Sequence, residues 1–254
     1  MIKSRRLWMI AVFFCSVFPC GASAGSPKEV TVSAAISLKN AFEEIGRLSR
    51  SRYGRPCIFN FGASGDLLKQ IAGGAPVDVF ASAAQKEMDD AAHQGLIAPA
   101  TRADVAANSV VLVVPSAAAT GLKSFEGLRE AEIKRIAVGN PKTVPAGRYA
   151  EEVFTSLRML ATVRDKLIYA ENVRQILDYV ARGEVDTGVV FATDAAAGSN
   201  NVKTVAAAPE ASHTPAVYPI AIVAGTKNEA AAKTFITLVL SPEGKKILQK
   251  HGFR

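Results

Sequence analysis

Four stretches of the sequence place small or hydroxyl-bearing residues directly before a predicted helix. Ser37 lies in the first stretch and Ser64 in the second, and residues 145–147 and 171–173 form the other two. The first turn of a helix carries backbone N–H groups that have no partner inside the helix, and the helix dipole is positive at that end. Openings of this kind suit the binding of an anion.

Helix capping is the simpler interpretation of each serine, because Ser is a preferred N-cap residue in any protein. In α/β proteins, however, ligands collect beyond the carboxyl ends of strands, at a topological switch point. The four stretches lie there if the strands predicted before them form. A binding role is then reasonable, but the residue types alone do not name the ligand.

Short β-rich runs alternate with helical patterns along the chain, which predicts an α/β fold with sheets covered by helices. The predicted strands are residues 30–35, 77–81, 110–114, 135–138, 167–169, 187–191 and 218–223. The predicted helices are residues 38–51, 85–94, 148–157, 173–181, 229–240 and 242–251. Because no Pro-rich linker or repeat separates independent domains, we expect two lobes joined by chain crossings.

The first 24 residues are predicted to be an export signal, with a basic start, an apolar run and a small-residue cleavage motif. No later apolar run reaches the roughly 18 to 20 residues that a membrane helix needs. Removing the signal removes three cations, so the formal charge falls from +7 to +4, and it leaves Cys57 without a disulfide partner. The remaining charges are interspersed, which argues against a nucleic-acid-binding surface.

Five motifs occur in order along the chain: AAISLKNA (34–41), GAPVDVFASA (74–83), VGNP (138–141), VPAGRYA (144–150) and ENVR (171–174). They resemble the periplasmic molybdate-binding component of ABC transporters. The resemblance runs from about Glu29 to Gly252 and Phe253, which is essentially all of the chain beyond the signal. It implies the type II periplasmic binding fold, with two α/β lobes and a ligand cleft between them. Lobe I is expected at residues 25–108 plus 217–254, and lobe II at residues 109–216.

The resemblance also implies how a ligand is held. Matched motif by motif, it assigns hydroxyl and backbone contacts to Ser37 and Ser64, and backbone N–H contacts to Ala146 and Val173. The ligand would be molybdate, and also tungstate, held as a bare oxyanion, with no cofactor and with molybdenum present only inside the oxyanion. Because each lobe supplies two loops, binding would favour closure. The implied partner is the membrane permease of an ABC importer, the implied location is the periplasm, and we expect a monomer.

One position departs from the family pattern. Phe191 stands where family members often carry a tyrosine whose hydroxyl donates to the anion. A hydrogen bond to a charged group contributes roughly 1.5 to 3 kcal/mol, so its loss would weaken binding about ten- to a hundredfold unless another donor substitutes. The substitution leaves open a different oxyanion, such as sulfate or phosphate.

An exported enzyme or a sensor domain on the same fold is the alternative from another functional class. Residues 62–66 approach the Gly-x-Ser-x-Gly elbow of hydrolases, but Asp66 stands where the second glycine belongs. None of the histidines lies in a recognised triad context, and no DNA-binding or membrane-signalling segment indicates a sensor. We therefore expect that the protein is not an enzyme.

Charged residues near the four stretches are interpreted as structural. Lys39, Arg148 and Arg174 are expected to be exposed helix cations. A carboxylate that faced a dianion would repel it. Asp78 and Asp194 are therefore expected to bond neighbouring N–H groups instead.

Overall fold

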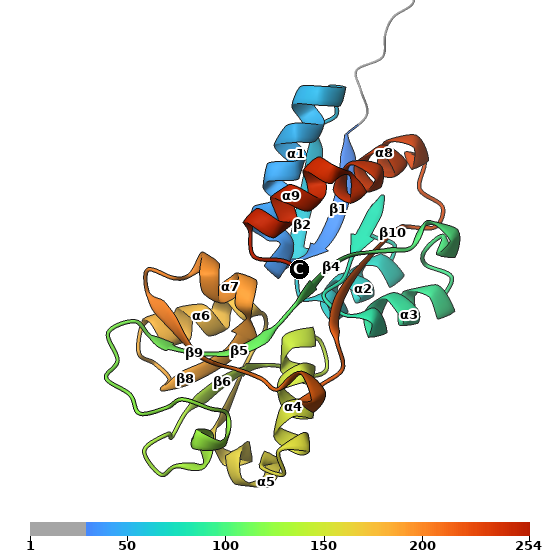
Figure 1. The fold of residues 1–254 in the computed structure, drawn as a ribbon. Helices are drawn as coiled ribbons and strands as arrows, with labels where there is room; N and C mark the ends of the chain where they lie inside the picture. The colour runs from blue at the N-terminus through green and yellow to red at the C-terminus, as the bar shows by residue number, and fades with distance from the viewer. Residues whose placement is uncertain (1–28) are drawn as a thin grey trace, which may run out of the picture.

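Two five-stranded sheets, each covered by helices, carry the four stretches singled out above (Figure 1). The computed structural model describes residues 29–254, so the predicted export signal at residues 1–24 lies outside the described residues. Within the described range, no helix is long and apolar enough to cross a membrane. The architecture is α/β with two lobes, as the sequence predicts.

The first sheet has the strand order β2-β1-β3-β10-β4. A 3-10 turn, η1 (Ile36–Leu38), joins β1 to α1. The strands are β1 (Val30–Ala35), β2 (Cys57–Gly62), β3 (Val79–Ala81), β4 (Ala103–Asn108) and β10 (Ala216–Ile222). The helices of this lobe are α1 (Lys39–Tyr53), α2 (Ser64–Ala72), α3 (Gln85–His93), α8 (Glu229–Leu240) and α9 (Pro242–Lys250).

The second sheet has the strand order β7-β6-β8-β5-β9. Its strands are β5 (Val110–Pro115), β6 (Ile136–Gly139), β7 (Leu167–Ala170), β8 (Thr187–Phe191) and β9 (Val202–Ala207). Its helices are α4 (Pro145–Ser156), α5 (Leu160–Val163), α6 (Val173–Ala181) and α7 (Ala192–Ala197). Further 3-10 turns lie in connections at Pro99–Thr101, Glu126–Arg129, Arg164–Lys166 and Glu210–Ser212.

Both sheets are paired in the same way. In the first, β2, β1 and β3 pair in parallel, and β10 and β4 are joined to them by antiparallel pairing. In the second, β7, β6 and β8 pair in parallel, and β5 and β9 are joined by antiparallel pairing. Parallel strands bring their carboxyl ends to one edge of a sheet. The segments that follow these six strands therefore gather at two such edges.

The chain passes between the lobes at two neighbouring places. Ser109 separates β4 from β5, and residues 208–215 connect β9 to β10. The last residue lies beside these crossings, because the backbone N–H of Arg254 donates to the carbonyl of Ala107 at 3.0 Å and the N–H of Ala107 donates back at 2.7 Å. The crossings are the points about which the lobes can move.

Apolar side chains fill the space between each sheet and its helices. In the first lobe, the buried rings of Phe42 on α1 and Phe235 on α8 meet edge to face, with ring centres 5.6 Å apart. In the second lobe, the buried rings of Phe125 and Phe154 are 6.5 Å apart. Aromatic side chains remove roughly 150 to 250 Å² each from water, so these contacts contribute strongly to holding α1 against α8 and α4 against the connection that carries Phe125.

The predicted elements agree with the structure best in the middle of the sheets. β1, β8, α6 and α8 have the predicted bounds. Three edge strands, β2, β4 and β9, were not predicted from the sequence. The helix α4 begins at Pro145, three residues before its predicted start at Arg148. Pro is favoured in a first helical turn because its missing N–H costs nothing there.

Candidate functional site

A narrow cavity lies where the two lobes meet, lined by segments that follow all six parallel strands. Its free volume is about 10 Å³. A volume of this size holds at most about one water molecule, so the lobes are nearly closed on each other. The lining residues are Ala35, Ile36, Ser37, Gly62, Ala63, Ser64 and Ala83 from the first lobe, and Val144, Pro145, Ala146, Asn172, Val173 and Phe191 from the second.

The structure brings all five residues singled out in the sequence to this one cavity: Ser37, Ser64, Ala146, Val173 and Phe191. They come from β1, β2, β6, β7 and β8 or the helices that follow them. The convergence follows from the sheet topology, because the carboxyl ends of parallel strands in both lobes face the same gap.

The two serines do not cap helices, so the capping interpretation is wrong for both. The N-cap residue of α1 is Leu38 and that of α2 is Ala63, and neither helix has a side-chain cap. Ser37 Oγ lies 3.0 Å from the hydroxyl of Tyr218. Ser64 Oγ accepts a hydrogen bond from the backbone N–H of Ala83 at 3.0 Å. A hydroxyl that accepts in this way keeps its own hydrogen to donate, and for Ser64 the cavity is where that hydrogen can go.

The helix openings of the second lobe present backbone donors. At α6, the side chain of Asn172 accepts from the N–H groups of Arg174 and Gln175, at 3.0 and 3.1 Å. That cap satisfies two of the first donors and leaves the N–H of Val173 beside the cavity. At α4, Pro145 occupies the first turn and Ala146 follows it at the cavity wall. Both openings combine a free first-turn N–H with the positive end of a helix dipole.

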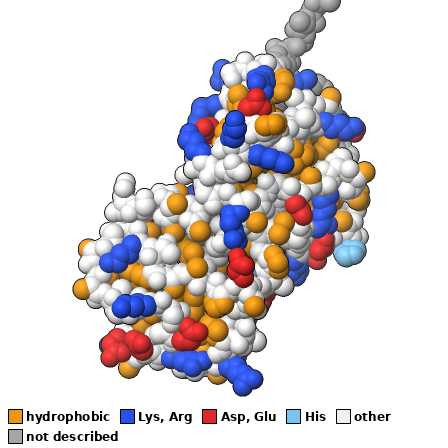
Figure 2. Space-filling view, viewed as in Figure 1, with side chains coloured by type: hydrophobic (Ala, Val, Ile, Leu, Met, Phe, Trp, Pro, Cys, Tyr) orange, Lys and Arg blue, Asp and Glu red, His pale blue; other side chains and the backbone are white. Residues whose placement is uncertain are grey.

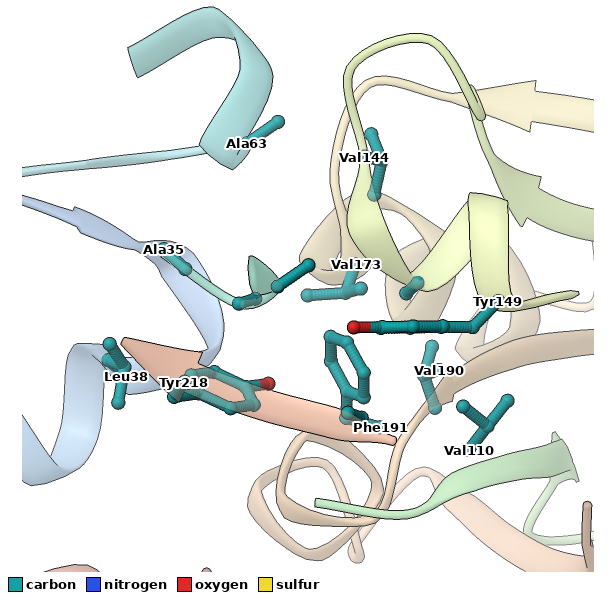
Figure 3. Packing of buried hydrophobic residues seen from close by; sticks show 14 of the residues in the cluster. Ala35, Leu38, Ala63, Val110, Val144, Tyr149, Val173, Val190, Phe191 and Tyr218 are labelled. Atoms are coloured by element: carbon teal, nitrogen blue, oxygen red, sulfur yellow. The ribbon is translucent and has the colours of Figure 1, made fainter. Parts of the chain in front are cut away.

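Phe191 lines the cavity with an apolar ring, and Figure 3 shows this ring between the side chains of Tyr149 and Tyr218. The ring is 1% exposed and lies between two tyrosines, with ring centres 6.1 Å from Tyr149 and 5.6 Å from Tyr218. Both contacts are edge to face, an arrangement that aromatic rings favour. The position therefore contributes shape but no hydrogen-bond donor.

No charged side chain is among the residues that line the cavity. Arg148 on α4 and Arg174 on α6, which follow two of the lining segments, each pair with a carboxylate. Figure 2 shows basic and acidic side chains interspersed on the face drawn, without a large area of one sign. Among residues 29–254, no group of three or more His, Cys, Asp or Glu side chains could hold a metal ion. The cavity is thus a neutral environment that offers N–H and O–H donors.

An ion pair joins the lobes beside the cavity. The guanidinium of Arg148 on α4 donates two hydrogen bonds, of 2.8 and 3.0 Å, to the carboxylate of Glu87 on α3. The side chain of Glu87 is 4% exposed and that of Arg148 is 19% exposed. A backbone contact supports the same closure, because the N–H of Gly65 donates to the carbonyl of Thr143 at 2.9 Å. A Cβ on Gly65 would come within 2.8 Å of Thr143, so only glycine allows this approach.

The second arginine pairs with a buried carboxylate behind the cavity. Arg174 Nε lies 3.3 Å from Asp194, but the two groups are not aligned for a hydrogen bond, and neither carboxylate oxygen has a partner among the described residues. Burial raises the pKa of Asp194 to about 7, and Arg174 opposes this shift. The sequence interpretation is therefore wrong in two respects here: Arg148 and Arg174 are not exposed cations, and Asp194 does not bond an N–H.

Two of the structural interpretations are confirmed. Lys39 is 44% exposed and pairs with Glu43 on the same helix. Asp78 accepts from the backbone N–H of Thr31 at 2.8 Å. Asp78 also borders a depression of about 770 Å³, which lies at the opposite edge of the first sheet, away from the strand ends that form the site.

The comparisons with known proteins agree with this geometry. A family model described as bacterial extracellular solute-binding protein matches residues 30–254. The chain belongs to that family. Such solute-binding proteins serve transport rather than catalysis, and none of the three histidines of this one lines the cavity.

Individual relatives cover nearly the whole chain. YvgL of Bacillus subtilis, provisionally named an ABC transporter substrate-binding lipoprotein, is 41% identical over 260 residues and spans 100% of this chain and 99% of its own. Molybdate-binding protein ModA of Escherichia coli is 38% identical and spans 92% of this chain and 91% of its own. The solved structure of the Azotobacter vinelandii periplasmic molybdate-binding protein has a TM-score of 0.78 at 26% identity, covering 89% of this chain and 98% of its own.

Removing the charge of Glu87 should open the solute-binding protein. Glu87→Gln leaves Arg148 without its counter-charge in a largely buried place, and the arginine regains water when the lobes separate. We expect a larger radius of gyration by small-angle X-ray scattering without added ligand. Asp90→Asn is the matched control, because Asp90 forms an exposed pair with Lys86 on the same helix. Equal radii for wild type and Glu87→Gln would contradict a role for the pair in closure.

The stability of the protein should depend on Asp194. Its folded pKa of about 7 lies above the ordinary value of 3.8, so the folded state holds a proton that the unfolded state releases. The free energy of unfolding should then fall as pH rises from about 4 to about 7, by at most about 1.4 kcal/mol per pH unit. Asp194→Asn should lose this dependence. Urea unfolding at several pH values measures it, and a pH-independent difference between the two proteins would refute the assignment.

Proposed function

We propose that this solute-binding protein captures molybdate, and also tungstate, in the cavity between its lobes. The observation that carries the proposal is that two serine hydroxyls and two helix-opening N–H groups, from opposite lobes, line one cavity without any charged side chain. The donors are Ser37, Ser64, Ala146 and Val173. The names of relatives such as the Escherichia coli ModA support the choice of anion.

A lining made of donors favours a fully ionised oxyanion. Each oxygen of a tetrahedral dianion can accept several hydrogen bonds, and it offers nothing to donate. Hydrogen phosphate carries a proton, which would need an acceptor in the lining. Sulfate and molybdate share charge and shape, so the separation of the donors across the cleft must distinguish them.

Closure around the ligand would make its capture visible from outside. The proposed lobe I consists of residues 25–108 plus 217–254, and lobe II of residues 109–216. An anion bonded to both lobes stabilises the closed arrangement by its greater affinity for it. The closed protein would then be recognised by the membrane permease of an ABC importer. We further propose export by the signal at residues 1–24, a periplasmic location, a monomeric state, and no cofactor or enzyme activity.

A different oxyanion is the second candidate, and Phe191 is the observation that favours it. The ring lines the cavity without offering a hydroxyl, and the shorter sulfur–oxygen bonds of sulfate would suit donors that lie closer together than those that molybdate needs. Isothermal calorimetry with molybdate, tungstate, sulfate and phosphate separates the candidates. Strongest binding of sulfate or phosphate would reject molybdate as the ligand.

The serines should matter for binding beyond any effect that they have on folding. Ser37→Ala and Ser64→Ala each remove a donor to a charged ligand, which is worth roughly 1.5 to 3 kcal/mol, so the dissociation constant for molybdate should rise about ten- to a hundredfold. Calorimetry measures the affinity, and urea unfolding of the ligand-free protein is the control. Loss of stability in place of affinity would mark the serines as structural.

Phe191→Tyr should strengthen binding of molybdate. The new hydroxyl would start from a ring that already lines the cavity, and one added donor to the anion can improve affinity about tenfold. The change should also raise the preference for molybdate over sulfate in competition calorimetry. If affinity is unchanged or lower, the hydroxyl does not reach the anion and another donor already serves that side.

A further inference from the structure

A chain of buried hydrogen bonds runs from the crossing strand to the back of Ser37. Asn108, the last residue of β4, accepts from the backbone N–H of Ser109 through its side-chain oxygen at 2.9 Å. That bond fixes the orientation of the amide, so its NH₂ group faces the hydroxyls of Tyr218, at 3.2 Å, and Thr193, at 2.9 Å. All of the side chains in this chain are buried. The contact with Tyr218 leads on to Ser37, at 3.0 Å.

The amide gives this chain a direction. An NH₂ group can only donate, so the oxygen of Tyr218 accepts from Asn108. A phenol has one hydrogen, and Ser37 is the acceptor beside it among the described residues, so the arrangement that satisfies this hydrogen has Tyr218 donating to Ser37. Ser37 then accepts, and its own hydrogen is left for the cavity. Burial raises the pKa of Tyr218 well above its ordinary value, with Asp194 adding to the shift, so the phenol keeps its hydrogen at neutral pH.

The hydroxyl of Ser64 is also left free to donate, but a single backbone contact achieves this. Its oxygen accepts from the backbone N–H of Ala83, a donor that cannot reverse. Ser37 has no backbone donor of this kind in the structure and relies on two side chains instead. Both serines of the cleft thus have an accepting lone pair occupied by the protein and a hydrogen free to face a ligand.

We infer that Asn108 and Tyr218 are positioning residues that hold Ser37 as a hydrogen-bond donor toward an oxyanion. Neither residue lines the cavity, so both act through Ser37. The inference rests on the proposed function, because a donating hydroxyl on Ser37 is useful only to a ligand that accepts hydrogen bonds. A hydrogen-bonded chain with one direction also polarises its last hydroxyl, which strengthens the bond to an anion. The same amide contacts Thr193 of the second lobe, so the chain begins where the lobes are joined.

A double-mutant cycle tests whether Tyr218 acts through Ser37. Calorimetry with molybdate is carried out on wild type, Tyr218→Phe, Ser37→Ala and the double variant. Tyr218→Phe should raise the dissociation constant about three- to tenfold when Ser37 is present, the size expected of a neutral hydrogen bond. In the Ser37→Ala background, Tyr218→Phe should change the dissociation constant less than twofold. If Tyr218→Phe changes the dissociation constant by the same factor in both backgrounds, the inference is overturned, because a purely structural effect of the ring does not depend on Ser37.

Tyr149→Phe is the matched control. Tyr149 is also buried and also contacts Phe191, but its hydroxyl bonds the carbonyl of Pro215, at 3.5 Å, rather than a serine. Its removal should affect both backgrounds by the same factor. If urea unfolding shows that Tyr218→Phe does not fold, Asn108→Ala combined with Ser37→Ala supplies an independent cycle. It should weaken binding only in proteins that retain Ser37, and an equal loss without Ser37 would refute the upstream part of the chain.

The outcomes separate this inference from the proposed function. Wild type that binds molybdate while the cycles are additive retains the function and loses the positioning role. Wild type that binds sulfate in place of molybdate rejects the proposed ligand, and the cycles run with sulfate then decide the inference. If wild type binds none of the four oxyanions, both the proposed function and the inference are rejected.

Discussion

An anion that leaves water for a neutral cavity must meet hydrogen-bond donors that are already in place, because unsatisfied charge is costly away from solvent. For the proposed ligand, the fold meets this requirement. Six parallel strands in two sheets end at one gap, and the segments at their ends line it, with small residues among them. Small side chains such as Ala146 and Ser64 let backbone and hydroxyl donors approach closely, which larger side chains would prevent.

Charge is kept out of the cavity and is used around it. The bidentate pair of Arg148 and Glu87 holds the lobes together from outside the site, where its geometry is good enough to offset part of the cost of burial. The pair of Arg174 and Asp194 is less well satisfied, with a carboxylate that has no hydrogen-bond partner among the described residues. The ion pair that joins the lobes and the groups that line the cavity are thus different residues, so each can be substituted separately.

Much of this arrangement could be predicted from the sequence. Central strands and amphipathic helices have strong patterns, and the four stretches converge because strand order fixes where their ends lie. The edge strands β2, β4 and β9 were missed because they are half-exposed and lack a continuous apolar run. Contacts between residues that are far apart in the chain also could not be predicted from the sequence. Ser37 and Tyr218 are 181 positions apart, and Tyr218 reads as one more apolar residue of a buried strand.

The neutral lining of the cavity has a consequence for the surroundings in which the protein works. Dissolved ions weaken the attraction between exposed charges, and at physiological concentrations they largely screen charges that are more than about 8 Å apart. Hydrogen bonds from N–H and O–H groups inside a closed cavity are too short and too shielded for this screening. A solute-binding protein built in this way can therefore retain its ligand when the salinity outside the cell changes, whereas a site made of exposed lysines would release it.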